Sequence, residues 1–382
     1  LNKIIYIHMR RVMYDFNNKK INQITSFDII SYLLSYKILK NKFFEEIDFI
    51  ELVVLNKIDS LSVHKSYNII EHAKFLNNLN EMKAIYLFFD KKISNKIEEI
   101  IVKMTSVLNQ YFHLDGSIPL FNGSNNNYTK IIYESLNKEE YLIKREFENA
   151  KNGIAFYANK NKKVFFDVVQ PNDNFISKEL SAGTLSFEFS GNGEKIITNC
   201  GASESLGANP EYLRYSAAHS TIILQNTNIS EIKAQNPHIK YPQSVKFISD
   251  KVAGNIIFEG SHNGYVKRFK KIIKRKLIIH RSECKISGED SIISIKDMNL
   301  KIIYHIRFHL MDGFSYNFTN NKKNIILKSK FKNMWLFKSD SELSVEDSIL
   351  VDNNTTNPTK QIVIKGIVTN KKLSKMWSLE KI

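Results

Sequence analysis

Apolar residues in the first part of the chain, residues 1–148, recur at the spacing of amphipathic helices. Three segments show this pattern: 29–39, a segment that begins at Ile69, and a segment that begins after Ser94. Serine suits the N-cap position, where its side-chain oxygen accepts a hydrogen bond from a free backbone amide. The expected buried stripes are Ala73, Leu76, Leu79 and Met82 in the second helix and Ile97, Ile100, Ile101, Met104, Leu108 and Phe112 in the third. Asp115-Gly116 is expected to end the third helix, and short connectors predict antiparallel helix pairs.

From residue 149 onward, the pattern changes to the two-residue alternation of β-strands. Gly191-Asn192-Gly193 separates two such runs and predicts a hairpin, because Gly and Asn tolerate the positive φ of tight turns. Strands are predicted at 153–157, 163–169, 184–189, 195–198, 220–224, 255–260, 265–279, 292–295, 301–310, 325–327, 334–337 and 361–368. Many short strands without intervening helices predict antiparallel sheets packed as a β-sandwich. The predicted fold is therefore α+β multidomain, with a helical domain in 1–148, whose connector is 115–148, and a β-sandwich in 149–382.

Composition describes an ordinary globular protein with room for two cores, since 43% of its 382 residues are hydrophobic. No apolar run approaches the ~20 residues of a transmembrane helix, and the first eleven residues lack the apolar stretch of a signal peptide. Because the chain begins with Leu1, we expect that a longer N-terminus, with any export signal, precedes it. Cys200 and Cys284 leave one disulfide open but form neither a disulfide framework nor a paired metal motif.

The net charge of +16 raises the question of nucleic-acid binding. Lysines are spread over both halves of the chain instead of forming one stripe, and no RNA- or DNA-reading motif occurs. We therefore expect no nucleic-acid partner. A basic surface would equally suit a polyanionic sugar, because carboxylates and sulfates bind the same Lys and Arg side chains as phosphates do.

Three stretches carry the most specific signal in the sequence. They span 179–189, 196–201 and 214–221. In order and spacing they resemble the core of heparinase II/III-like proteins. Residues 260–265 and 306–310 are similar to later strands of that domain, and residues 115–123 are similar to its connector from a helical domain. The resemblance covers most of residues 115–310.

This resemblance implies an α/α-toroid, here a partial one, followed by a β-sandwich, and a lyase that acts on acidic polysaccharides by β-elimination. In that reaction a base removes the proton α to a uronate carboxylate, nearby donors stabilise the enolate, and an acid protonates the leaving oxygen. The family also implies export to the periplasm or cell envelope, while the lack of a signal peptide leaves a cytoplasmic location open.

The resemblance also assigns counterparts of the family's structural zinc ligands, which are two His and one Asp. They are Ser181, Asn199 and His219 in this chain. A hydroxyl and a neutral amide are poor zinc ligands, so we predict no tightly bound zinc and no other cofactor. Glu179 stands where relatives have a further, catalytic His. Arg214, which precedes His219 in the third stretch, is the candidate that binds the substrate carboxylate.

Candidate residues in the helical domain cluster at the predicted start of a helix. They are His64, Lys65 and Tyr67, and Tyr67 loosely matches the family's catalytic Tyr. We predict Tyr67 or His64 as the base or acid, with Lys65 and Glu179 near the substrate and His219 as an orienting residue. The non-catalytic alternatives are a packing role for Tyr67, a solvated turn for His64, and a structural hydrogen-bond pair for Arg214 and His219. The Asn-His pair with which relatives bind the carboxylate has no counterpart at 24–28.

Two further groups of polar residues are not assigned to the catalytic site. His305, Arg307 and His309 share one face of a predicted strand, where a half-solvated polar face is favoured over a metal site. The basic run from Lys267 to Lys276 either binds a polyanion or forms a solvated face.

The leading hypothesis is thus a lyase of an acidic glycan. The second hypothesis is a carbohydrate-binding or envelope-biogenesis protein that kept the fold and lost the site. The third, nucleic-acid binding through charge alone, predicts steep salt dependence with any polyanion.

Overall fold

The computed structural model describes residues 47–88, 90–129, 132–133, 136, 146–149, 153–171, 180–203, 211–232, 242–296, 301–352, 355–369 and 371–382, with positions 7, 10, 11, 14 and 18. The chain forms two compact units that interleave along the sequence. The first unit comprises Leu1–Lys65, Ile69–Gln110 and Lys130–Tyr141, and the second comprises Ser66–Asn68, Tyr111–Thr129 and Leu142–Ile382. The predicted helix 29–39 lies outside the described residues, and the predicted domain boundary after residue 148 stays a prediction.

The described part of the first unit is helical. It contains α3 (Ile47–Lys57), α4 (Ile69–Phe88) and α5 (Asn95–Gln110). The predicted stripes of α4 and α5 are buried, and the Ser94 hydroxyl accepts a hydrogen bond from the Ile97 amide at 3.3 Å. Both helices and the cap are therefore confirmed, while a toroid stays a prediction. Among the described helices, none has the length and apolar character needed to cross a membrane.

The third helix ends earlier than predicted, at Gln110 instead of Asp115. The residues after it form a turn in which the His113 amide donates to the Ser117 carbonyl at 2.7 Å. The His113 ring is hydrogen-bonded to Glu188 and Ser190 in the second unit. The Leu114 amide donates to the Ser190 hydroxyl at 3.3 Å, so the backbone amides of His113 and Leu114 bond outside the helix instead of continuing α5.

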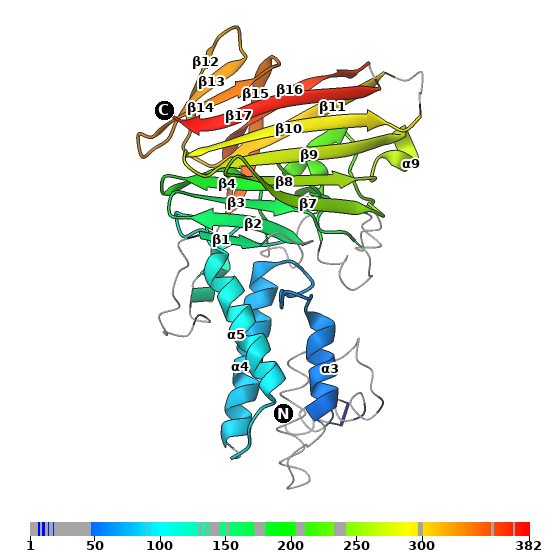
Figure 1. Cartoon of the computed structure of the whole chain (residues 1–382), viewed down its shortest axis with the longest axis vertical. Helices are drawn as coiled ribbons and strands as arrows, with labels where there is room; N and C mark the ends of the chain where they lie inside the picture. Colours follow the sequence, from blue (N-terminus) through cyan, green and yellow to red (C-terminus); the bar gives the residue numbers. More distant parts are fainter. Residues whose placement is uncertain are drawn as a thin grey trace. The chain divides into compact units, whose positions relative to one another are not determined.

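The second unit contains two antiparallel sheets (Figure 1). In the described residues, the nine-stranded sheet runs in the order β1 (Glu146–Asn149), β2 (Ile154–Asn159), β3 (Lys162–Asp167), β4 (Phe187–Gly191), β5 (Glu194–Thr198), β11 (Ile302–Leu310), β16 (Thr355–Val368) and β15 (Leu343–Asp352), with β6 (Ile222–Leu224) on β11. The eight-stranded sheet runs β12 (Ser315–Thr319), β13 (Asn324–Lys328), β14 (Met334–Ser339), β17 (Lys372–Lys381), β10 (Lys285–Ser294), β9 (Lys271–His280), β8 (Asn255–His262) and β7 (Val245–Val252). Short helical turns are η2 (Asn126–Tyr128), α8 (Glu211–Arg214), η3 (Ser216–Ala218) and α9 (Val266–Phe269).

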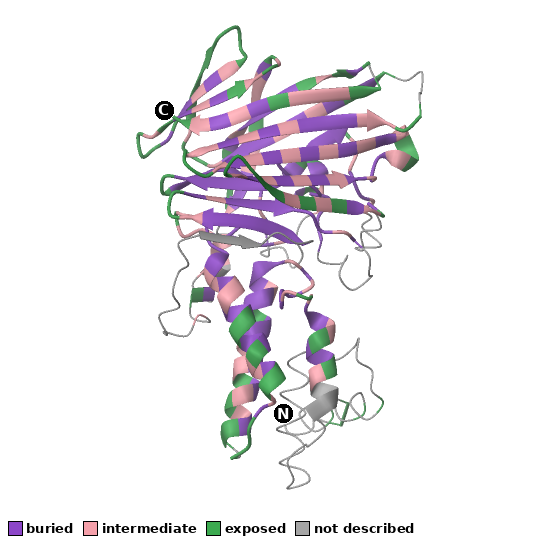
Figure 2. Ribbon diagram, viewed as in Figure 1, coloured by how far each residue is buried: buried purple, intermediate pink, exposed green. Residues whose placement is uncertain are grey.

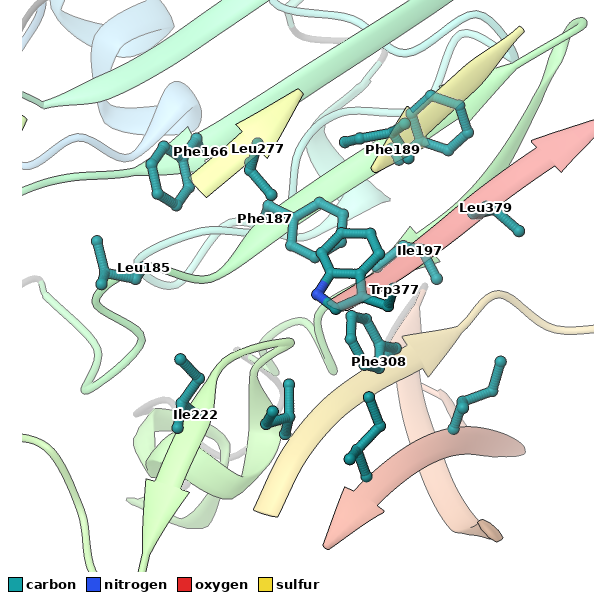
Figure 3. Packing of buried hydrophobic residues seen from close by; sticks show 14 of the residues in the cluster. Phe166, Leu185, Phe187, Phe189, Ile197, Ile222, Leu277, Phe308, Trp377 and Leu379 are labelled. Atoms are coloured by element: carbon teal, nitrogen blue, oxygen red, sulfur yellow. The ribbon is translucent and has the colours of Figure 1, made fainter. Parts of the chain in front are cut away.

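One hydrophobic core lies between the two sheets. Buried and half-buried residues alternate along β8 and β9 (Figure 2), as expected for strands with one face on a core. Trp377 stacks on Phe187 with ring centroids 5.3 Å apart, and Phe308 meets Trp377 edge-on (Figure 3). The predicted fold class, helices followed by an antiparallel β-sandwich, is therefore confirmed.

The hairpin at 191–193 is also confirmed, with φ of 51° at Asn192 and 83° at Gly193. The predicted strand 265–279 is instead the helical turn α9 followed by β9. Lys270, which separates them, has a φ of 54°, a left-handed conformation that ends the turn and that the strand pattern did not indicate.

Candidate functional site

The first and third of the three stretches meet at Gly183. A Cβ atom added to Gly183 would lie 2.5 Å from Cδ2 of His219, so only glycine allows the ring to pack this closely. The Ala182 amide donates to the Arg214 carbonyl at 2.8 Å, and the Ser216 hydroxyl donates to the Ala182 carbonyl at 2.7 Å. The residues that the resemblance grouped are therefore brought together within the second unit.

His219 is buried, with an exposed fraction of 4%. Its Nδ1 lies 2.9 Å from the Tyr215 carbonyl oxygen, which can only accept, so Nδ1 carries the proton. Burial lowers the pKa of His219 to about 4, so the ring is neutral at pH 7. Nε2 therefore presents a lone pair, and it makes no hydrogen bond to the described residues. The ring can therefore accept a hydrogen bond at Nε2.

Arg214 holds the first stretch in place. Its Nε and Nη2 donate to the Leu180 carbonyl at 3.2 and 2.8 Å. The guanidinium is only partly buried, and further polar contacts engage it. Leu180 directly follows Glu179, which lies outside the described residues. Arg214 thus fixes the backbone beside the position at which the sequence predicts a substrate-facing carboxylate.

The counterparts of the zinc ligands do not fit a zinc ion. Asn199 donates through Nδ2 to Glu188 at 3.1 Å, and its Oδ1 accepts from the Ser220 amide at 2.9 Å. Both ends of this amide are therefore used in joining the second stretch to the first and third. Within the part of the chain that the structure describes, no three His, Cys, Asp or Glu side chains form a metal-binding group.

Tyr67 belongs to the second unit and reaches the same region through Asn122. Asn122 donates through Nδ2 to the Tyr67 carbonyl at 3.4 Å, and its Oδ1 accepts from the Ser181 amide at 3.1 Å. The Tyr67 ring lies against Gly153, where an added Cβ would be 2.7 Å from Cε1. Tyr67 is half-buried and has a φ of 50°. The structure therefore links Tyr67 to the first stretch through one side chain.

Sequence reasoning missed the role of Asn122. The signal that could have found it is the Asn122-Gly123 pair in the connector, because both residues adopt positive φ, 52° and 84°.

His64 and Lys65 lie in the first unit. The His64 amide donates to Nδ1 of His72 at 3.2 Å, and its ring lies 5.5 Å from that of Phe75. Burial is the largest of the causes that lower the pKa of His64 to about 3. The alternative that His64 is a solvated turn residue is therefore wrong, whereas the catalytic and binding roles of His64 and Lys65 stay predictions.

Glu188 forms a buried hub that the sequence did not single out. Its Oε1 accepts from the amides of Leu120 and Asn199, both at 3.0 Å. Its Oε2 contacts His113 Nε2 at 2.9 Å and Lys195 Nζ at 3.0 Å. Burial alone would raise the pKa of Glu188, but Lys195 and His113 lower it to about 2. A permanently ionised carboxylate thus joins the connector to β4 and β5.

The predicted half-solvated polar face of β11 is wrong at His309, which is buried, whereas His305 and Arg307 are half-buried. His309 donates through Nε2 to the Ala217 carbonyl at 3.0 Å and accepts at Nδ1 from the Ser348 hydroxyl at 2.7 Å. Arg307 donates to Gln361 at 3.0 Å. Both nitrogens of His309 are therefore occupied by protein groups.

The predicted basic run does not form one surface. Arg275 is fully buried between the sheets, where its Nε bonds Asp290 at 2.6 Å. Lys274 is half-exposed and pairs with Glu259 at 2.6 Å. The expectation that the whole run binds a polyanion or faces solvent is wrong at Arg275, because strand alternation turns that side chain inward.

Comparison with solved structures shows the fold. The heparan sulfate lyase HepC from Pedobacter heparinus matches with a TM-score of 0.72 at 11% identity, covering 93% of this chain and 59% of that one. Two heparinase III structures match with TM-scores of 0.75 and 0.73 at 10% and 13% identity, each over 61% of its length. Those two matches cover 98% and 93% of this chain. The chain thus spans about three fifths of the length of these structures.

A sequence comparison with curated proteins finds no match. The family model for the heparinase II/III-like C-terminal domain matches residues 145–378, more than half of the chain. The chain therefore belongs to the heparinase II/III-like family.

Proposed function

We propose that the protein is a polysaccharide lyase that cleaves an acidic, uronate-containing glycan by β-elimination. Family membership supports this chemistry, and the names of the matched structures, heparan sulfate lyase and heparinase III, indicate the substrate class. The single observation that carries the proposal is local. Asn122 joins Tyr67 to Ser181, two residues from the Gly183 against which a neutral His219 packs.

In this proposal Tyr67 carries out the proton transfers and His219 is the orienting residue. The Tyr67 phenolate takes the proton from the α-carbon, and the phenol so formed gives that proton to the leaving glycosidic oxygen as the C–O bond breaks. The Nε2 lone pair of His219 accepts a hydrogen bond from a sugar hydroxyl or from the phenol, and so orients it. Arg214 offers a guanidinium to the uronate carboxylate. His64, Lys65 and Glu179 remain further candidates for the substrate-facing set.

The proposed partner is an acidic polysaccharide or oligosaccharide. A basic chain, with a net charge of +16, attracts such a polymer over several ångströms. The proposed location is the periplasm or cell envelope, where such glycans would be met.

A second candidate function is supported by the same contacts. Arg214 donates through Nε and Nη2 to the Leu180 carbonyl, and both ends of the Asn199 side-chain amide are hydrogen-bonded to protein groups. A site whose polar groups bond to the protein itself suits a carbohydrate-binding or envelope-biogenesis protein that retains the fold without the reaction.

The experiment that separates the two functions measures ultraviolet absorbance from unsaturated uronate ends. The protein is incubated with heparin, heparan sulfate, chondroitin, hyaluronan, alginate and bacterial acidic glycans. The lyase proposal expects a rise with one glycan, which Tyr67→Phe abolishes and Tyr316→Phe, a change on the exposed strand β12, leaves intact. Binding without product supports the second function. Neither product nor binding across the panel contradicts both.

A further inference from the structure

We infer that Arg275, which comes from the eight-stranded sheet, is a positioning residue for His219 and for the turn that contains Gly183. This inference rests on the proposed function for its effect on catalysis, whereas its effect on the His219 ring can be measured without any activity.

Arg275 contacts both stretches that meet at Gly183. Its Nη1 donates to the Leu185 carbonyl at 2.9 Å and to the Ser220 carbonyl at 2.6 Å. Ser220 directly follows His219, and Leu185 lies two residues after Gly183. One guanidinium nitrogen thus bridges the backbone on either side of the contact between Gly183 and the His219 ring.

The other side of the guanidinium is fixed by a carboxylate. Nε and Nη2 bond the two oxygens of Asp290 at 2.6 and 3.0 Å, and Trp377 Nε1 donates to the same carboxylate at 2.9 Å. The guanidinium carbon also lies 5.3 Å from the centroid of the Phe187 ring. A planar fork held at its far side cannot rotate, so the position of Nη1 is defined by the core.

The backbone at this point requires such a support. Leu185 has a φ of 63°, a conformation that is strained for a non-glycine residue and persists only where surrounding contacts impose it. The Ser186 amide donates to the Gly183 carbonyl at 2.8 Å, and the Thr221 hydroxyl donates to the Thr184 carbonyl at 2.8 Å. The turn 183–186 is therefore hydrogen-bonded to Thr221 as well as to Arg275. Arg275 also binds the Ser220 carbonyl, so it connects this turn to the segment that contains His219.

Arginine is required for this task because a lysine cannot reach all the acceptors. A Lys ammonium could neutralise Asp290 or meet one carbonyl, but it lacks the planar geometry that serves a carboxylate and two carbonyls together. Without the bridge, the Gly183 turn and the His219 segment can move apart, and water can enter beside the ring.

The test compares Arg275→Lys with Lys162→Met. Lys162 is the matched control, since it is a buried cation that also donates to two carbonyls, those of Arg281 and Glu283. It stands at the start of β3, whereas the 183–186 turn bonds Asp167 at the end of that strand.

The first readout is the ¹⁵N spectrum of His219, assigned with His219→Gln. We expect a single Nδ1-protonated tautomer in the wild type and in Lys162→Met. In Arg275→Lys we expect mixed tautomers and a pKa that moves from about 4 toward 6.5. If Arg275→Lys does not fold, Arg275→Met/Asp290→Asn replaces it, since this pair leaves no unpaired charge in the core. A wild-type His219 spectrum in a folded Arg275 variant overturns the inference.

The second readout is lyase kinetics on the glycan identified above. We expect Arg275→Lys to lower kcat about 100-fold with KM nearly unchanged, because misplacement by about 1 Å has effects of that size. An equal loss in Lys162→Met would reduce Arg275 to a general structural role. If the wild type cleaves no glycan, the proposed function fails while the His219 spectrum still decides the role of Arg275.

Discussion

Replacing Gly183 by alanine tests the close packing of His219 most directly. The added Cβ would lie 2.5, 2.9 and 3.1 Å from Cδ2, Cγ and Nε2 of the ring, whereas ordinary contacts begin at 3.4 Å. The ring must therefore move by almost 1 Å, although it is buried and its Nδ1 is hydrogen-bonded to the Tyr215 carbonyl. Overpacking of this kind costs about 1–3 kcal/mol, so we expect Gly183→Ala to lower the free energy of unfolding by that amount.

The decisive comparison is a double-mutant cycle with His219→Ala. Because all three clashing atoms belong to the ring, Gly183→Ala should cost less than about 0.5 kcal/mol once the ring is absent. Gly264→Ala is the matched control: its Cβ would lie 2.7 Å from the Ile229 carbonyl oxygen, which His219→Ala does not remove. This control should cost the same in both backgrounds.

Urea unfolding followed by tryptophan fluorescence measures these changes. Trp335 and Trp377 are the only tryptophans of the chain, and both are buried in the second unit, so the signal reports on the sandwich alone. An equal cost of Gly183→Ala with and without the His219 ring would refute the close-packed arrangement, as would a neutral Gly183→Ala.

Three further predictions follow from buried charges and from the zinc counterparts. Glu188→Gln should destabilise the sandwich by about 3–5 kcal/mol, because it leaves Lys195 buried without its counter-ion. A urea midpoint close to that of the wild type would contradict the role of Glu188 as a buried hub. Burial raises the pKa of Asp167 from 3.8 to about 7, so the folded state binds the proton more tightly and wild-type stability falls as pH rises from about 4 to 7. Asp167→Asn, which keeps an acceptor for the Val169 amide, should therefore raise the Tm at pH 8 relative to wild type and much less at pH 5, whereas a pH-independent difference would exclude this titration. Treatment with EDTA should leave the Tm unchanged, and a clear drop that zinc reverses would show that a metal site exists after all.

The helices could be predicted because their signal is local. The apolar stripe of α5 repeats every turn, and Ser94 caps it as its residue type suggests. Strands β1, β7, β12, β15 and β17 were missed. In the last four of these strands, exposed or half-exposed positions dilute the alternation. Their pairing partners lie far along the chain, and those partners determine which face is buried.

The residues of the candidate site also divide into those that the sequence predicts and those that it does not. Resemblance found Arg214 and His219, because these residues stand in stretches with a recognisable order. Arg275 was grouped with surface lysines, although it alternates in phase with Ile273 and Leu277, which are buried. That phase was a usable signal. The link from Asn122 to Ser181 was not predictable, since the two residues are 59 positions apart and meet only through a side-chain hydrogen bond.

The buried carboxylate of Glu188 has a consequence for how this chain could be recombined with another. Its oxygens are shared between strand residues and the connector residues His113 and Leu120. A crossover after residue 148 would give the sandwich a foreign connector and leave Glu188 and Lys195 facing whatever side chains arrived with it. A crossover before Tyr111 would transfer all of these partners at once. The connector should therefore be inherited with the sandwich, and chimaeras joined before Tyr111 should fold more readily than those joined after residue 148.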